Sequence, residues 1–323
     1  MIVVTGGAGF IGSAFIARLN AEGIDDIIVV DDLAVSEKWK NLVKRRFIDY
    51  LHKSVFLNMV DSGRVSFPVE AVVHMGACSS TTERDCNYLS ENNFHYTCLL
   101  AQWALEKGVR FIYASSAATY GDGSQGFSDA DEATLGLRPI NMYGYSKQLF
   151  DLRVLREGMA DKVAGIKFFN VFGPNEYHKG DMTSMVFKAF HQIRETGRVR
   201  LFKSYKPEYP DGGQMRDFVY VKDAVDVLWW LLSHREVNGI FNLGTGKART
   251  WNDLIRAVFA AMECPPAIDY IEMPEAIRGQ YQYFTEAQMD KLRAAGCPAA
   301  FHLLEQTVAD YVKTHLLAAD PYL

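Results

Sequence analysis

A tyrosine and a lysine lie four residues apart in the stretch NMYGYSKQLFD, at positions 143 and 147. The surrounding residues have helical periodicity and contain no proline, so Tyr143 and Lys147 share one face of a predicted helix. The two residues form either a solvated surface pair or a reactive pair, in which the ammonium lowers the pKa of the phenol for proton transfer. The Y-x-x-x-K spacing by itself does not decide between these interpretations.

A second motif supplies a serine for the same chemistry. RFIYASSAATYG (110–121) places Ser115 and Ser116 at the carboxyl end of a predicted strand, where ligands bind in open α/β sheets. Oxidation of a secondary alcohol needs a base for the hydroxyl proton and an acceptor for the hydride. Free tyrosine, with a pKa of about 10, becomes a useful base when an ammonium and a positive nicotinamide favour the phenolate. We therefore interpret Ser116, Tyr143 and Lys147 as a catalytic set.

The N-terminal stretch TGGAGFIG has the spacing of a dinucleotide-binding turn. Gly6, Gly9 and Gly12 follow a predicted strand directly and open a predicted helix. Gly6 allows the tight turn, Gly9 lets the backbone approach a pyrophosphate, and Gly12 lets the helix pack close to the sheet. The helix N-terminus then offers free N–H groups to the phosphates. Because strand, glycines, helix and a later acidic residue occur in order, the sequence predicts nucleotide binding.

The residues after the second predicted strand bear on which nicotinamide cofactor is bound. Asp31 and Asp32 end that strand, where an acid normally takes the ribose hydroxyls of NAD. The segment that follows is basic and includes Lys38 and Lys53. It is either a solvated helix face or a cluster that neutralises a 2′-phosphate and so favours NADP. Spacing alone does not decide between the two.

The elements that position these motifs alternate along the first half of the chain. Strands are predicted at residues 2–7, 26–32, 71–77, 110–116 and 165–171, with helices such as 91–107 and 144–159 between them. This alternation indicates an α/β fold with a doubly wound parallel, Rossmann-type sheet. We expect residues 1–170 to form the dinucleotide-binding domain. A strand and a helix from about residues 217–246 should also belong to this domain. Residues 171–323 should form mainly a smaller α/β substrate lobe.

Composition excludes several other classes of protein. The chain has 323 residues, enough for two lobes, and its net charge of −5 gives no basic footprint for nucleic acid. No apolar run is long enough for a membrane span, and the N-terminus lacks the pattern of a signal peptide. The five scattered cysteines and eight histidines include no C-x-x-C or H-x-x-x-H. We therefore expect a reducing, cytoplasmic location and no metal site.

Together the motifs resemble the extended short-chain dehydrogenase/reductase superfamily, and within it the nucleotide-sugar epimerases that act on C6 of an ADP-activated heptose. The resemblance covers almost the whole chain and is carried by VTGGAGFIGS, GACSSTTE (76–83), NNFHY (92–96), ASSAATYG, YGYSK, FFNVFGPNEYHKG (168–180), MRDFVYVKD (215–223), FNLGTGKA (241–248) and YQYFT (281–285). It implies NADP as cofactor, an ADP-heptose substrate whose product feeds lipopolysaccharide synthesis, and a homo-oligomer such as a pentamer.

The resemblance also implies roles for individual residues. Tyr143 matches the family's catalytic base and Lys179 a second acid/base, beside Lys147 and Ser116. The implied cofactor site comprises Gly6, Gly9, Phe10, Ile11, Gly12, Asp31, Asp32, Lys38, Lys53, Met75, Gly76, Ala77, Cys78, Ser79, Asn92, Lys147, Val171 and Lys179. The implied substrate site comprises Asn170, Asp181, Lys188, Phe202, Lys203, Ser204, Tyr205, Arg216 and Tyr281. Asp181, Lys188 and the length of loop 205–215 depart from the family pattern, which weakens the substrate assignments.

Three other functions compete with this interpretation. A 4,6-dehydratase needs an acid pair after the serine, whereas Ala117 and Ala118 follow Ser116 here. A nucleotide-sugar 4-epimerase uses the same Ser/Tyr/Lys set, and Lys179 with GACSSTTE is what favours the 6-epimerase. A non-catalytic NADP-binding sensor has no need of Tyr143, which this chain keeps.

The substitution Tyr143→Phe tests the proposed base directly. It removes the phenolic hydroxyl and keeps the ring, so fold and dinucleotide affinity should be preserved. We expect the rate of epimerisation to fall about 10²–10⁴-fold, as is typical when a general base is lost. Turnover assays beside a dinucleotide titration measure both quantities, and a variant within about threefold of the wild-type rate would remove Tyr143 from this role.

Overall fold

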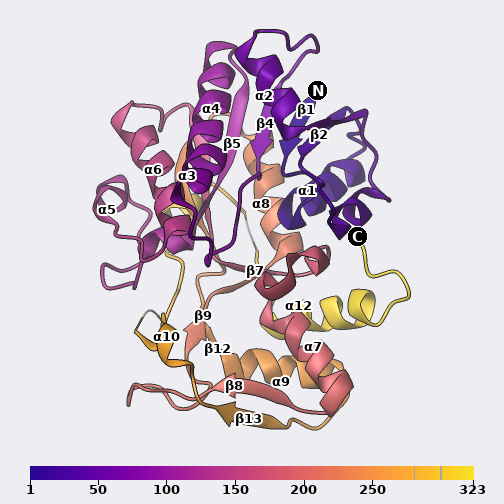
Figure 1. Ribbon diagram of the computed structural model, residues 1–323, viewed down its shortest axis with the longest axis vertical. Helices are drawn as coiled ribbons and strands as arrows, with labels where there is room; N and C mark the ends of the chain where they lie inside the picture. Colours follow the sequence, from indigo (N-terminus) through magenta and orange to yellow (C-terminus); the bar gives the residue numbers. More distant parts are fainter. Residues whose placement is uncertain (280, 299) are drawn as a thin grey trace.

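The computed structural model describes residues 1–279, 281–298 and 300–323, and at its centre lies a seven-stranded parallel sheet (Figure 1). The strands are β1 (Ile2–Thr5), β2 (Ile27–Asp31), β3 (Asp49–His52), β4 (Ala71–His74), β5 (Arg110–Ser116), β6 (Val163–Phe168) and β11 (Gly239–Leu243). Their order is β11-β6-β5-β4-β1-β2-β3. Strands β1, β2 and β4 are buried at every position, as their runs of Val and Ile predict. The predicted fold class is confirmed.

Helices cover both faces of this sheet (Figure 1). On one face α1 (Phe10–Ala21) packs against α8 (Val221–Ser233), and on the other lie α2 (Lys53–Asp61), α4 (Tyr96–Glu106) and α6 (Met142–Arg156). Each face has its own apolar core. The core beneath α1 and α8 is the larger, because it continues into the C-terminal half of the chain. The sheet and the smaller lobe therefore share one packed interior.

The remaining elements build the smaller lobe and the loops around the sheet. They are η1 (Glu37–Leu42), α3 (Cys86–Leu89), η2 (Ser90–His95), η3 (Ala117–Tyr120), α5 (Asp131–Gly136), β7 (Asn170–Phe172), η4 (Tyr177–Met182), α7 (Met185–Thr196), β8 (Val199–Phe202), β9 (Met215–Arg216), β10 (Phe218–Tyr220), β12 (Arg249–Thr250), α9 (Trp251–Ala261), β13 (Ile268–Ile271), α10 (Glu275–Arg278), α11 (Asp290–Ala294), α12 (Leu304–Asp310) and η5 (Tyr311–Leu316). In Figure 1, α7, α9, β8 and β13 lie below the sheet. Because β11 pairs with β6, we propose that segment 217–246 returns to the dinucleotide-binding unit formed by residues 1–170, and that residues 171–323 otherwise form the substrate lobe.

Some boundaries differ from those predicted. The expected helix at 91–107 begins with a π-helical turn, η2, before α4 starts at Tyr96. The expected strand at 165–171 is two strands, β6 and β7, which join different sheets. Among the helices formed by residues 1–279, 281–298 and 300–323, none has the length and apolar character needed to cross a membrane.

The strand order reverses between β1 and β4, which opens a crevice at their carboxyl ends. The glycine turn after β1 and the segment after β4 meet there in close backbone contact. Gly6 has a φ of +63°, and a Cβ on it would lie 2.6 Å from the backbone of Gly76. A Cβ on Gly12 would lie 2.1 Å from the carbonyl oxygen of Gly6. Any side chain at either position would force the turn apart.

The substitution Gly12→Ala should therefore harm both stability and dinucleotide binding. We expect it to lower the free energy of unfolding by about 1–3 kcal/mol, as overpacking usually does, and to weaken dinucleotide binding. Gly136→Ala is the matched control, because the nearest atom to a Cβ there is 3.5 Å away. Denaturant unfolding and a dinucleotide titration of both variants measure the effects. Equal behaviour of the two variants would contradict this account of the turn.

Candidate active site

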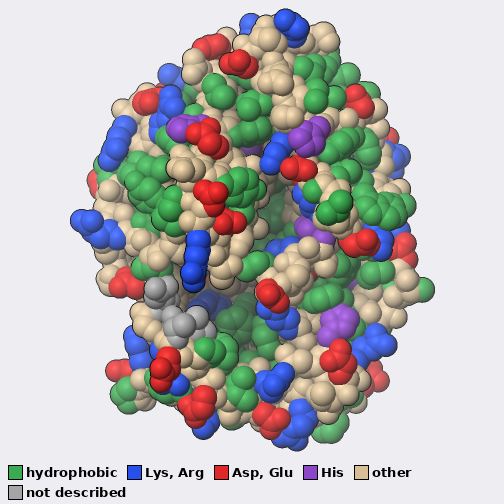
Figure 2. Space-filling model, in the orientation of Figure 1, with side chains coloured by type: hydrophobic (Ala, Val, Ile, Leu, Met, Phe, Trp, Pro, Cys, Tyr) green, Lys and Arg blue, Asp and Glu red, His purple; other side chains and the backbone are tan. Residues whose placement is uncertain are grey.

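A cavity of about 790 Å³ lies at the carboxyl ends of the central strands. Its walls come from the glycine turn, the segment after β4, the end of β5 and the start of α6 on one side, and from segment 168–172, η4 and α7 on the other. Figure 2 shows this face of the molecule hollowed between its upper and lower parts, with basic and hydrophobic side chains inside the hollow. The cavity thus lies at the switch point where open α/β sheets bind ligands, and its size suits a ligand of nucleotide scale.

The predicted catalytic set lines this cavity. Ser116 ends β5, and its hydroxyl accepts a hydrogen bond from the Ala118 N–H at 3.1 Å. Tyr143 and Lys147 face the cavity from α6. This helix starts where it does because the Asn141 side chain accepts the N–H of Gly144 at 2.8 Å. A strand end and a helix start therefore bring together the three residues that the motifs predicted.

Burial dominates the electrostatics of this set. It raises the pKa of the Tyr143 phenol, and hydrogen bonding with Ser116 offsets part of that effect. Burial also lowers the pKa of Lys147 to about 8, against the opposing influence of Asp151. The Lys147 ammonium donates to the carbonyl oxygen of Ala114 at 2.8 Å, and no hydrogen bond within the described ranges joins it to the phenol. The ammonium is therefore bound to the backbone of β5.

Lys179 lines the cavity from η4, on the wall that faces the catalytic set. Its ammonium lies 5.0 Å from the ring centre of Phe10, in the glycine turn. Burial lowers the pKa of Lys179, and the nearby Glu176 carboxylate opposes that shift. Glu176 is itself fully buried, and it accepts hydrogen bonds from the hydroxyls of Ser184 at 2.6 Å and Tyr311 at 3.0 Å. These bonds hold the loop that carries Lys179.

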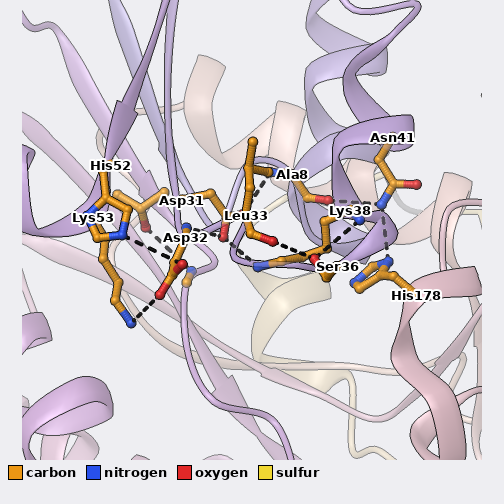
Figure 3. Close-up of polar contacts among 12 residues, drawn as sticks. Ala8, Asp31, Asp32, Leu33, Ser36, Lys38, Asn41, His52, Lys53 and His178 are labelled. Carbon is orange, nitrogen blue, oxygen red and sulfur yellow. Dashed lines mark hydrogen bonds and ion pairs between the residues drawn. The ribbon is translucent and has the colours of Figure 1, made fainter.

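At the far end of the glycine turn, each predicted acidic residue is paired with a lysine (Figure 3). Asp31 accepts from the Lys38 ammonium at 2.8 Å and from the Ala8 N–H at 2.9 Å. Asp32 pairs with Lys53 at 3.3 Å. The cavity formed here, of about 280 Å³, shares Asp31 and Lys38 with the main one. The net charge of this cluster is therefore close to zero, because each carboxylate is paired with an ammonium.

Asn92 also lies at this end, where its side-chain oxygen accepts from Lys53 at 3.0 Å. Of the predicted cofactor residues, the remaining ones line the main cavity: Gly6, Gly9, Phe10, Ile11, Gly12, Met75, Gly76, Ala77, Cys78, Ser79, Lys147, Val171 and Lys179. The glycine turn, which has no room for a Cβ at Gly6 or Gly12, faces this lining from the start of α1. These residues fit a dinucleotide laid across the carboxyl edge of the sheet.

The buried Asn41 and the partly buried His178, which lines the main cavity, make contacts that the sequence did not reveal. The Asn41 amide donates to the carbonyl oxygens of Ala8 at 2.9 Å and Asn175 at 3.1 Å, and lies 3.3 Å from His178 Nδ1 (Figure 3). Burial, with nearby lysines, lowers the pKa of His178 to about 4, so its ring is neutral near pH 7. Asn41 thereby ties the glycine turn to the loop that carries Lys179. No sequence motif signals a contact across 134 residues.

Asn93 makes a similar connection behind α6. Its side chain accepts from the Cys78 N–H at 2.8 Å and donates to the Cys78 carbonyl oxygen and to Ser146 Oγ, both at 3.0 Å. The Ser146 hydroxyl in turn donates to the carbonyl oxygen of Tyr143 at 2.7 Å. Asn93 lies in the π-helical turn η2, which the helical pattern of the sequence did not reveal. The cavity wall after β4 and the start of α6 are thus held together.

The predicted substrate residues fall into separate groups. Asn170 and Lys188 line the main cavity, and Lys188 donates to the carbonyl oxygen of Asp181 at 2.6 Å. The structure places Lys203, Ser204 and Tyr205 outside both of these cavities. Lys203 pairs with Glu272 at 2.7 Å, and the Tyr205 hydroxyl donates to the same carboxylate. The structure therefore does not bring this last group into contact with the cavity lining.

Arg216, Tyr281 and Phe202 form an aromatic cluster next to the cavity, together with Trp251. The Arg216 guanidinium lies 5.3 Å from the Tyr281 ring centre and 5.7 Å from that of Trp251, whose Nε1 donates to the Tyr281 hydroxyl at 3.0 Å. The Phe202 and Tyr281 ring centres are 6.4 Å apart. Trp251 is the member that lines the cavity, and sequence reasoning missed it because its position is typical of the first residue of an ordinary helix.

Comparisons with known proteins agree with this geometry. Residues 2–244 match the NAD dependent epimerase/dehydratase family. The chain belongs to this family. It is 63% identical to the ADP-L-glycero-D-manno-heptose-6-epimerase of Nitratidesulfovibrio vulgaris (strain DP4), with all of both chains covered. The resemblance to heptose 6-epimerases that the sequence motifs indicate is thereby confirmed.

Two solved structures share the fold of this chain. The ADP-L-glycero-D-manno-heptose-6-epimerase of Helicobacter pylori superposes with a TM-score of 0.81 at 24% identity, covering 97% of this chain and 95% of that one. The UDP-glucose 4-epimerase of Thermus thermophilus, solved in complex with NAD, gives 0.75 at 25% identity, with 97% of each chain covered. Membership of the family and this likeness support a nicotinamide dinucleotide as the cofactor. Within the described ranges, no group of three His, Cys, Asp or Glu side chains is placed to hold a metal ion.

Proposed function

We propose that the protein inverts C6 of ADP-D-glycero-D-manno-heptose to give ADP-L-glycero-D-manno-heptose, with NADP as cofactor. One observation carries the proposal: Tyr143 on α6 and Lys179 on η4 line the same cavity from facing walls. An epimerase has to handle the same hydroxyl in two orientations, and two acid/bases on facing walls suit that task. The 63% identical relative, named for this reaction, supports the choice of substrate.

The chemistry at C6 explains why these groups are needed. The C6 hydrogen has no carbonyl beside it, so its removal as a proton would leave an unstabilised carbanion. The bound nicotinamide dinucleotide supplies a hydride acceptor and donor for C6. Tyr143 takes the proton of the C6 hydroxyl, and Ser116 orients the oxygen. Rotation about C5–C6 of the resulting 6-ketone presents its other face for return of the hydride, and Lys179 then donates the proton that the oxygen needs in its new position.

The residues that would hold the cofactor follow from the same geometry. The glycine turn and the N-terminus of α1 receive the pyrophosphate, and Lys147 lies beside Tyr143 at the nicotinamide end. At the adenosine end, Lys38 and Lys53 supply positive charge for a 2′-phosphate, which we propose as the basis of a preference for NADP. Asp31 and Asp32 hold both ammoniums in position.

The substrate would occupy the part of the cavity farther from the glycine turn. Asn170, Lys188 and Trp251 line it, and Arg216 and Tyr281 lie directly behind Trp251. A guanidinium beside aromatic rings is suited to a diphosphate attached to a base. From the resemblance we further propose action in the cytoplasm, as a homo-oligomer, in lipopolysaccharide inner-core synthesis.

The proposed reaction is tested by incubating the enzyme with ADP-D-glycero-D-manno-heptose in D₂O. We expect the two C6 epimers to reach equilibrium with no net consumption of NADP and no deuterium at C6, because the hydrogen leaves and returns as hydride. NMR and mass spectrometry measure both quantities. Lys179→Met should slow epimerisation and retain bound NADP, whereas Lys162→Met, which removes an exposed lysine, should not.

Deuterium that appears at C6 in step with epimerisation would reject the hydride route. Full activity of Lys179→Met would remove Lys179 from the mechanism. Failure to convert this substrate, together with conversion of a UDP-hexose at C4, would replace the proposed function with a 4-epimerase.

The preference for NADP is tested by replacing both lysines of the adenosine end. Lys38→Ala with Lys53→Ala should weaken NADP binding far more than NAD binding, by about tenfold or more, because two charge-assisted contacts to the 2′-phosphate are lost. Lys40→Ala with Lys44→Ala removes the same charge from the same segment at positions outside both cavities. Calorimetry with each nucleotide measures the affinities. Equal losses of affinity for NADP and NAD would contradict the preference for NADP and indicate that this end of the site binds the ribose of NAD.

A further inference from the structure

A buried ion pair lies next to the catalytic set, on the side away from the cavity. Asp151 follows Lys147 by one turn of α6, and its carboxylate pairs with the Lys167 ammonium of β6 at 2.6 Å. Both side chains are fully buried. The Asp151 carboxylate also accepts from the hydroxyls of Tyr113 at 2.9 Å and Ser115 at 2.7 Å, both on β5. Three hydrogen-bond donors from two strands thus fix one carboxylate on the catalytic helix.

The lysine end of the pair reaches the segment that carries the catalytic serine. The Lys167 ammonium donates to Thr119 Oγ1 at 2.9 Å, and the Thr119 hydroxyl donates to the carbonyl oxygen of Ser116 at 2.8 Å. Lys167 also lies 5.3 Å from the ring centre of Tyr120. The pair therefore joins β5, β6, η3 and α6, which include all the elements that carry Ser116, Tyr143 and Lys147.

Stability alone does not account for a charged pair at this place. Desolvation of two charges is costly, and apolar side chains of similar volume are often as stable in the same position. A carboxylate differs from an apolar side chain in one respect that matters here, which is its negative charge one helical turn from Lys147. The position of Asp151 thus points to an electrostatic role for it.

The surroundings of Lys147 contain few other sources of negative charge. Within the described residues, the titratable groups that interact with Lys147 are Asp151 on α6, Cys78 after β4 and His74 on β4. Tyr143 lines the same cavity, and Lys167 of β6 lies behind Asp151. Burial lowers the pKa of His74 to about 3, so its ring is neutral near pH 7. Burial also lowers the pKa of Lys147 to about 8, and Asp151 is the largest influence that opposes this shift.

We propose that Asp151, held in place by Lys167, is a positioning residue that keeps Lys147 protonated beside Tyr143 during catalysis. This inference rests on the proposed epimerase function, in which the Lys147 ammonium favours the phenolate of Tyr143. Without the carboxylate, the pKa of Lys147 falls below its value of about 8. Lys147 then loses its proton at lower pH, and the rate should begin to fall at lower pH as well.

The test compares pH profiles of kcat/KM for epimerisation by the NADP-bound enzyme. Asp151→Asn removes the charge and keeps the shape. Asp151→Asn with Lys167→Met also removes the unpaired ammonium, so this variant should fold even where the single one does not. We expect the alkaline limb of the profile to move down by about one pH unit in the double variant, and further in Asp151→Asn, where the Lys167 ammonium stays as an unpaired like charge.

Tyr113→Phe is the matched control, because it removes one hydrogen bond to Asp151 and keeps the carboxylate charge. A purely structural role predicts that this variant and the Asp151 variants lose thermal stability and leave the alkaline limb in place. We expect Tyr113→Phe to lower the melting temperature without moving the limb. An unmoved limb in the double variant, or an equal shift in Tyr113→Phe, would overturn the proposal.

A second readout separates this inference from the proposed function. The ¹⁵N chemical shift of the Lys147 side chain, assigned by comparison with Lys147→Arg, reports the pKa of Lys147 without turnover. The pKa should be lower in the double variant than in the wild type and unchanged in Tyr113→Phe. Failure of the wild type to invert C6 would reject the proposed function, whereas an unchanged pKa of Lys147 in the double variant would reject the role of Asp151.

Discussion

The close backbone contact between the glycine turn and the segment after β4 is the constraint on which the rest of the site depends. Gly6 adopts a left-handed conformation, and its Cα hydrogens face Gly76 at a separation that no side chain would allow. The contact lies where the strand order reverses, so the N-terminus of α1 and the segment after β4 border one crevice. Both segments line the cavity, and their contact fixes this part of its wall.

The burial of two lysines, each with a carboxylate nearby, is the second physical theme of this structure. Lys147 and Lys179 are two ammoniums on facing walls, and burial lowers the pKa of both. Each has a buried carboxylate near it that opposes the shift, Asp151 in one case and Glu176 in the other. In both lysines burial favours loss of the proton and the neighbouring carboxylate favours its retention. The same arrangement therefore recurs on two unrelated elements of the fold.

The loop that carries Lys179 depends on contacts from distant parts of the chain. Asn41 bonds it to the glycine turn, and Glu176 bonds it to Ser184 and Tyr311. Buried polar groups need hydrogen-bond partners. Loss of one partner would leave the other group unpaired, and its desolvation would then be uncompensated. The position of Lys179 in η4 is thus set largely by hydrogen bonds from distant segments.

Much of the fold and the centre of the site follow from the sequence alone. The alternation of apolar strands and amphipathic helices determined the parallel sheet, and the glycine spacing determined the turn, because both depend on local periodicity and on backbone freedom. The sequence also placed Ser116 at the carboxyl end of a strand and grouped it with Tyr143 and Lys147, because the three residue types suit one reaction. The contacts between distant segments were decided only by the tertiary structure. The Asp151–Lys167 pair, the contacts of Asn41 and Asn93, the place of Trp251 and the position of Lys203 to Tyr205 outside the cavities all depend on which distant segments pack together, and no spacing within one segment encodes that.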